Sequence, residues 1–160
     1  MQRTQEAENF YQTHRPRTST LLPILKLMTD ELLGHVGDEQ LRALCFAVGS
    51  RLGETSPASK IEKLSELEKW ARQWLAERDW GWLAIEYHDD AVDLIHGDAP
   101  LESWFGDGAL AWSAALFEGL YATWIRQLGA DERLQLRQIR LADRPAGELR
   151  FRLAHESRFQ

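Results

Sequence analysis

Histidine and aspartate side chains gather between residues 88 and 98, and both residue types are common metal ligands. The group consists of His88, His96, Asp89, Asp90, Asp93 and Asp98. If this region is a hairpin with a two-residue turn, His96 lies opposite Leu83, five residues along the strand from His88. At about 3.3 Å per residue, the two imidazoles would then be roughly 17 Å apart. We therefore expect no metal site and interpret His96 as a hydrogen-bonded structural histidine.

Other candidates for chemistry carry weaker signals. The 25 acidic residues offer many carboxyl pairs, but hydrolysis of a glycosidic bond needs two at a defined separation, one with a raised pKa, and no pattern singles out such a pair. Cys45 lies on the apolar stripe of an expected helix, where a thiol is inert. Gly106-Asp107-Gly108 is too short for a phosphate loop and lacks its lysine. We expect no catalytic residue and no cofactor.

Composition indicates one ordinary globular domain, with 160 residues, 44% of them hydrophobic and 28% charged. The net charge of -6 and the pI near 5.4 argue against a nucleic-acid partner, and the single cysteine excludes a disulfide framework. Tryptophan and arginine, which are enriched at protein interfaces, are abundant. No apolar run fits a secretory signal or the roughly 20 residues that span a bilayer. We expect a cytoplasmic protein that does not span the membrane, with the periplasm as the alternative.

Three helices are expected after a flexible polar arm at residues 1–20. Apolar residues recur at helical spacing over three stretches, 21–33, 38–52 and 59–77. Asp38 would cap the second helix and Gly53 would end it, whereas a capping box opened by Ser59 would begin the third. Trp70 lies off the apolar stripe of the third helix, so it is a candidate exposed aromatic.

A first hairpin is expected where the period changes to two. Apolar and polar residues alternate over 82–88 and 91–96, on either side of an Asp89-Asp90 turn. In this register Ile85 lies opposite Leu94, and one face of the hairpin is apolar.

A long buried helix and a second hairpin complete the chain. The segment 109–128 is apolar almost all round, which is typical of a buried helix. The second hairpin pairs 134–141 with 148–154, with a bulge between Leu136 and Ile139. The order predicts an α+β fold, with helices packed on an antiparallel sheet made of two β-hairpins and a long buried helix between them, in a single domain over 21–160.

The two hairpin regions carry opposite charge. Residues 77–118 hold ten acids and one base, whereas residues 133–160 hold seven arginines and three acids. The charges either pair within one sheet or steer self-association between copies, and both interpretations stay open.

Three motifs in the right order and spacing carry a family resemblance. They are Trp80-Gly81-Trp82, Leu94-Ile95-His96-Gly97-Asp98-Ala99-Pro100 and Leu116-Phe117-Glu118-Gly119-Leu120-Tyr121-Ala122-Thr123-Trp124. Over about residues 21–155 the chain resembles the D component of bacterial cellulose synthase complexes. The resemblance assigns structural roles to nine motif residues: Trp80, Gly81, His96, Pro100, Glu118, Gly119, Leu120, Tyr121 and Trp124.

That resemblance implies a non-catalytic accessory protein that forms a ring-like homo-octamer built from dimers. Such a ring organises or guides nascent β-1,4-glucan chains during export for crystalline cellulose, and its partners are the other synthase subunits and a proline-rich protein. The family's N-terminal part faces the inner passageways, so Phe10 and Tyr11 would contact the glucan. Two alternatives remain open, a glucan-trimming hydrolase and an α+β domain that binds a small apolar ligand beside 109–128.

Overall fold

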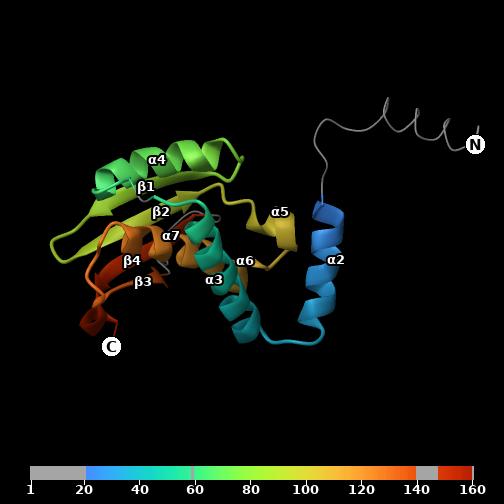
Figure 1. Cartoon of the computed structure of the whole chain (residues 1–160). Helices are drawn as coiled ribbons and strands as arrows, with labels where there is room; N and C mark the ends of the chain where they lie inside the picture. Colours follow the sequence, from blue (N-terminus) through green and yellow to red (C-terminus); the bar gives the residue numbers. More distant parts are fainter. Residues whose placement is uncertain (1–20, 59, 140–147, 160) are drawn as a thin grey trace, which may run out of the picture.

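The computed structural model describes residues 21–58, 60–139 and 148–159. In chain order, the helices and strands are α2 (Leu22–Leu33), α3 (Asp38–Thr55), α4 (Leu64–Ala76), β1 (Trp82–Tyr87), β2 (Ala91–Gly97), α5 (Leu101–Phe105), α6 (Leu110–Ser113), α7 (Ala115–Gln127), β3 (Leu134–Ile139), β4 (Leu149–His155) and a 3-10 turn at Glu156–Arg158. The expected α+β fold is confirmed (Figure 1).

The four strands form one antiparallel sheet in the order β1-β2-β4-β3. The first hairpin has the expected register, because Ile85 pairs with Leu94 and Leu83 with His96. The two hairpins join through β2 and β4, where Leu94 pairs with Phe151. Each of these five side chains is buried on the same face of the sheet.

The bulge expected in β3 is wrong. The register between β3 and β4 runs without interruption, with Leu136 opposite Leu153 and Ile139 opposite Arg150. The apolar pattern slips because Leu136 is buried in the core, whereas Ile139 is half-buried on the opposite face. Residues 140–147, which hold the remainder of the expected strand and its connection, lie outside the described part of the chain.

The buried helix lies across the apolar face of the sheet. The expected helix over 109–128 is α6 and α7 with a single break at Ala114. Ten of the thirteen residues of α7 are buried, which confirms that it is apolar and enclosed on nearly all sides. It packs side by side with α3, as Figure 1 shows.

α4 covers the free edge of β1. The Arg72 guanidinium donates to the Leu83 carbonyl at 2.7 Å, and the Glu68 carboxylate accepts from the Ile85 amide at 3.1 Å. Arg72 and Glu68 also pair with each other at 2.6 Å. These bonds occupy backbone groups that a second sheet could otherwise use, so α4 protects the edge against strand addition.

Three expected helix ends are wrong. Gly37 caps α3 in place of Asp38, and the Gln40 side chain accepts from the Gly37 amide at 3.1 Å. α3 continues past Gly53 to Thr55, because Gly53 packs against α7 inside the helix. α4 begins at Leu64, and Ser59 lies outside the described residues.

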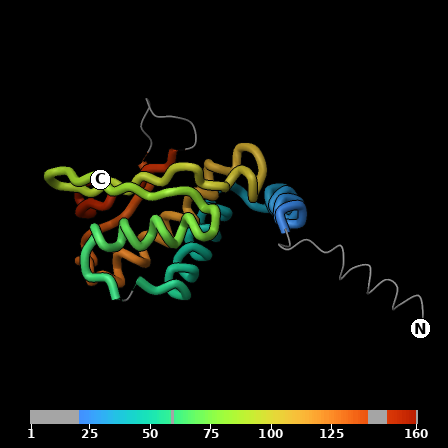
Figure 2. Tube along the Cα trace, turned by 90° about the horizontal axis from the view of Figure 1, so that it is seen from above, coloured from blue at the N-terminus to red at the C-terminus, as the bar shows by residue number. Residues whose placement is uncertain are grey.

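α2 stands away from the sheet and touches the rest of the molecule mainly at α5, as Figure 2 shows. Thr29 is its one buried residue. No helix within the described part of the chain is both long and apolar enough to cross a bilayer.

Candidate functional site

His96 links β2, α7 and the segment before β1. Its ring is fully buried, and Nε2 lies 2.8 Å from the Trp80 carbonyl oxygen, so Nε2 carries the proton and donates it. Nδ1 is then an acceptor, and the Tyr121 hydroxyl donates to it at 2.6 Å. His96 is thus hydrogen-bonded, as expected, and its two bonds bring together three of the motif residues, Trp80, His96 and Tyr121.

Burial keeps this pair uncharged. Desolvation lowers the pKa of His96 to about 4, against the opposing effects of the Trp80 carbonyl and Asp98. Desolvation also raises the pKa of Tyr121 well above its ordinary value. Both groups are therefore neutral near pH 7.

We expect the free energy of unfolding to fall by about 3 kcal/mol as the pH drops from about 6.5 to about 4, because one pKa unit corresponds to about 1.4 kcal/mol. Between these pH values His96 binds a proton in the unfolded chain but not in the folded one. Its contribution to the free energy of unfolding is therefore fully present above the unfolded pKa of about 6.5 and is lost as the pH falls to the folded pKa of about 4.

Urea unfolding at several pH values measures the slope of the free energy of unfolding against pH. His96→Gln should flatten it, whereas exposed His35→Gln should not. An unchanged slope in His96→Gln would contradict this origin.

Two further motif residues shape the backbone around this link. Gly81 has φ +88°, and a Cβ there would lie 2.1 Å from the Gly97 carbonyl oxygen, so only glycine fits. Gly81 separates Trp80, which packs inward, from exposed Trp82. Pro100 caps the start of α5, a short helix that the sequence pattern did not predict.

Tryptophan side chains form a contiguous edge-to-face cluster beneath α4. Trp124 packs against Trp70 and Trp74 with ring centroids 4.8 and 5.2 Å apart, and Trp80 lies 5.3 Å from Trp74 and 5.1 Å from Trp104. The Trp124 indole donates to the Ser56 carbonyl at 2.9 Å, which ties α7 to the end of α3. Trp70 is half-buried in this cluster, so the prediction that it is exposed is wrong.

Glycines let α3 and α7 approach closely. A Cβ at Gly49 would lie 1.8 Å from the Leu116 carbonyl oxygen, and one at Gly119 would lie 2.2 Å from that of Phe46. Gly49 and Gly53 are four residues apart, a spacing that could have indicated the contact from sequence. Next to the crossing, buried Glu118 forms an ion pair with Arg42, and fully buried Leu120 completes the motif.

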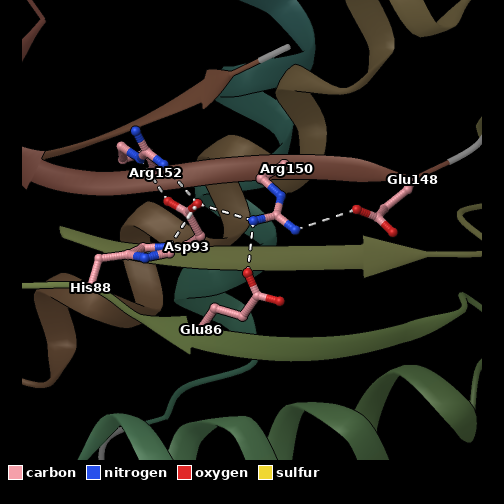
Figure 3. A network of polar contacts seen from close by, with 6 residues as sticks. All are labelled: Glu86, His88, Asp93, Glu148, Arg150 and Arg152. Atoms are coloured by element: carbon pink, nitrogen blue, oxygen red, sulfur yellow. Dashed lines mark hydrogen bonds and ion pairs between the residues drawn. The ribbon is translucent and has the colours of Figure 1, made fainter. Parts of the chain in front are cut away.

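A charged network occupies the other face of the sheet (Figure 3). Asp93 is fully buried, and Arg152 donates to both of its carboxylate oxygens at 2.7 and 2.9 Å. Arg150, 5% exposed, donates to Asp93 at 3.1 Å and to Glu86 at 2.9 Å, and lies 3.6 Å from Glu148. The opposite charges of the two hairpins therefore pair within one sheet in this region. For these residues, pairing within the sheet is the interpretation that holds, rather than steering of self-association.

The pKa of Asp93 reflects these partners. Burial alone would raise it, but hydrogen bonds from Arg152, Arg150 and His88 outweigh that effect and hold it below the usual value. Glu86, His88 and Asp93 place ligand-type atoms within 4.8 Å of one another, the spacing of a metal site. Both Asp93 oxygens already accept from guanidinium groups, so the cation in this group is arginine.

His88 and His96 lie on opposite faces of the hairpin, since His88 reaches Asp93 and His96 reaches Tyr121. They cannot share one metal ion, as the register predicted. Phe10 and Tyr11, the expected glucan contacts, lie outside the described residues.

Most of the motif residues thus meet in a framework of one histidine link, one helix crossing and one aromatic cluster, whereas Trp82 is exposed and Pro100 caps α5. The family model for the D component of cellulose synthase matches residues 9–152 of the chain, and the protein belongs to that family. The match reaches into the N-terminal arm, which the motifs alone did not cover. A search of curated proteins found no match. Membership of this family supports a place in the cellulose synthase complex, in association with its other subunits.

Proposed function

We propose that this protein is a non-catalytic structural subunit whose copies assemble into a ring that guides glucan chains during cellulose export. The observation that carries the proposal is a large exposed apolar surface on α2 and α3. The proposal adds assembly and glucan guidance to the family assignment.

The α2–α3 surface consists of eight large apolar side chains that are 39–69% exposed: Leu21, Ile24, Leu27, Met28, Leu32, Leu33, Leu44 and Val48. Together they expose on the order of 800 Å², divided between the groove side and the outer side of α2, an area comparable with what each partner contributes to an interface of standard size. Isolated proteins rarely leave so much neighbouring apolar surface uncovered. Self-association is therefore the favoured reason for it.

A groove runs between the two helices of this surface. Its volume is about 280 Å³, and it is lined by side chains of α2 and α3, mostly apolar, together with Phe105, Trp112 and Leu116. α2 carries apolar residues on both its groove side and its outer side, Met28 and Leu27 for example. Two copies can therefore cover each other with the same surface, as a two-fold interface requires. The groove is slightly smaller than a typical small-molecule site.

The absence of catalysis is part of the proposal. Burial would raise the pKa of Asp93, but hydrogen bonds from arginine outweigh it and lower the pKa, and bonds from Arg133 lower the pKa of Asp131. A glycosidase acid needs the opposite shift. Release of sugar from cello-oligosaccharides that depends on one carboxylate would contradict a scaffold role.

Finer features rest on the family resemblance. We infer a homo-octamer of dimers, contacts with a proline-rich partner, and a passageway lined near Phe10 and Tyr11. The net charge of -6 supports the expectation that nucleic acid is not a partner. Cytoplasmic placement stays a prediction.

Charged substitutions test the α2–α3 surface. Ile24→Glu and Leu44→Glu put a carboxylate on side chains that are 59% and 50% exposed, so the fold should survive and the solution mass should fall. Leu134→Glu, on β3 and 38% exposed, is the matched control and should keep the wild-type mass. If the control dissociates the assembly and the other two variants do not, the interface lies elsewhere.

A further inference from the structure

Trp82 presents its indole to solvent on the charged face of the sheet. It is 43% exposed, although it lies within β1 rather than in a loop. The alternation of the strand places it on the same face as Ala84 and Glu86. The ring–ring contacts that cover Trp80 and Trp124 do not extend to Trp82 in the described part of the chain.

The indole is held in one orientation. Its Nε1 donates to the Asp98 carboxylate at 2.9 Å. A Cβ on Gly97 would lie 2.2 Å from both Cε2 and Cζ2 of the ring, so the ring lies against the Gly97 backbone. One face of the indole therefore covers β2, and the exposed area belongs to the other side.

The backbone that holds the ring adopts uncommon conformations. Gly81 has φ +88° and Asp98 has φ +55°, one on each side of the Trp82–Gly97 pair. Aspartate is one of the few residues other than glycine that adopt left-handed backbone readily. Here it positions the Asp98 carboxylate that fixes the Trp82 indole.

The surroundings of Trp82 favour a sugar over a protein. A protein hot spot is an aromatic in a desolvated pocket with apolar neighbours. Along this face Trp82 is followed instead by small Ala84 and by Glu86, whose side chain is 46% exposed. A pyranose ring needs such a flat apolar platform for its C–H groups, with carboxylates at the rim to accept from its hydroxyls.

We propose that Trp82 is a stacking platform for a glucose unit of a β-1,4-glucan, with Asp98 as the positioning residue that holds the indole. This inference rests on the proposed function for its choice of ligand. It adds a glucan contact within the described part of the chain to the contacts expected of Phe10 and Tyr11.

The test is calorimetric titration of the full-length, assembled protein with cellohexaose. Trp82→Ala should weaken binding about tenfold, which corresponds to the loss of one stacking contact of about 1.4 kcal/mol. Tyr87→Ala is the matched control, because Tyr87 is an exposed aromatic on the same strand but on the opposite face, and its binding should equal that of the wild type.

Gly97→Ala tests the orientation without removing the indole. The added methyl group meets side-chain atoms of Trp82 rather than backbone, so the protein should fold while the ring is displaced and binding weakens. Unchanged affinity in Trp82→Ala would overturn the inference, and so would a wild type that binds no cellohexaose. A fall in solution mass for Trp82→Ala would also overturn it, by making Trp82 a contact between copies. The scaffold function is judged separately, by the mass of the wild type.

Discussion

Replacing Asp93 with alanine is expected to lower the free energy of unfolding by about 3–5 kcal/mol, the usual cost of breaking a buried ion pair from one side. Asp93 is fully buried and Arg150 is 5% exposed. Without Asp93, Arg150 keeps Glu86, which reaches solvent, and Glu148 at 3.6 Å. Its charge then stays buried with poorer compensation, and Arg152 loses both bonds to the carboxylate.

Urea unfolding of the full chain measures this effect. Asp131→Ala is the matched control, because Asp131 also pairs with an arginine, Arg133 at 2.8 Å, but on the surface. Exposed pairs of this kind contribute little, so the control should unfold like the wild type. A loss below about 1 kcal/mol for Asp93→Ala would show that Arg150 finds other compensation.

The loss should also depend on pH. The pKa of Asp93 is lowered in the folded state, so its contribution is present above the ordinary carboxyl pKa of about 3.9 and disappears as the pH falls through the folded value. This window lies below that of His96, so the two effects can be separated in one pH series.

Gly49→Ala is the second substitution with a large expected effect, a destabilisation of about 3 kcal/mol or more. Alanine is the better helix former by roughly 1 kcal/mol, but the new Cβ would lie 1.8 Å from the Leu116 carbonyl oxygen. The obstacle is helix backbone, so α3 and α7 must move apart. The buried surface between them is then lost.

Two other glycines make the result interpretable. Gly53→Ala meets the Thr123 side chain at 2.8 Å, so it should destabilise less than Gly49→Ala and stay measurable if that variant does not fold. Gly34→Ala, at the end of α2 with an ordinary 3.4 Å contact and φ -71°, should be close to neutral. Equal stability of all three variants would contradict the close crossing.

Sequence patterns correctly predicted the features that are determined by residues close together in the sequence. The register of β1 and β2 followed from alternation and a two-residue turn, and the turn closes with the His88 amide donating to the Ala91 carbonyl at 2.9 Å. Placing His96 on the apolar face by that register was enough to predict a structural role.

Features that depend on distant segments were not predictable from the same patterns. Trp70 is off the apolar stripe of α4, but Trp124, from a helix far along the chain, covers it. From the sequence alone Gly53 is interpreted as a helix end, because the sequence does not show that Thr123 packs against it. One sheet of two hairpins was predicted, but the strands that join them, β2 and β4, were not, because each hairpin looks complete alone.

The mass of the wild-type protein in solution, measured by light scattering over a concentration series, tests the central claim most directly. A scaffold whose α2–α3 surface is covered by other copies should give one discrete assembly of several subunits, with a mass independent of concentration. A stable monomer of 18.4 kDa across the whole series would contradict it, since the exposed apolar surface would then have no copy to cover it.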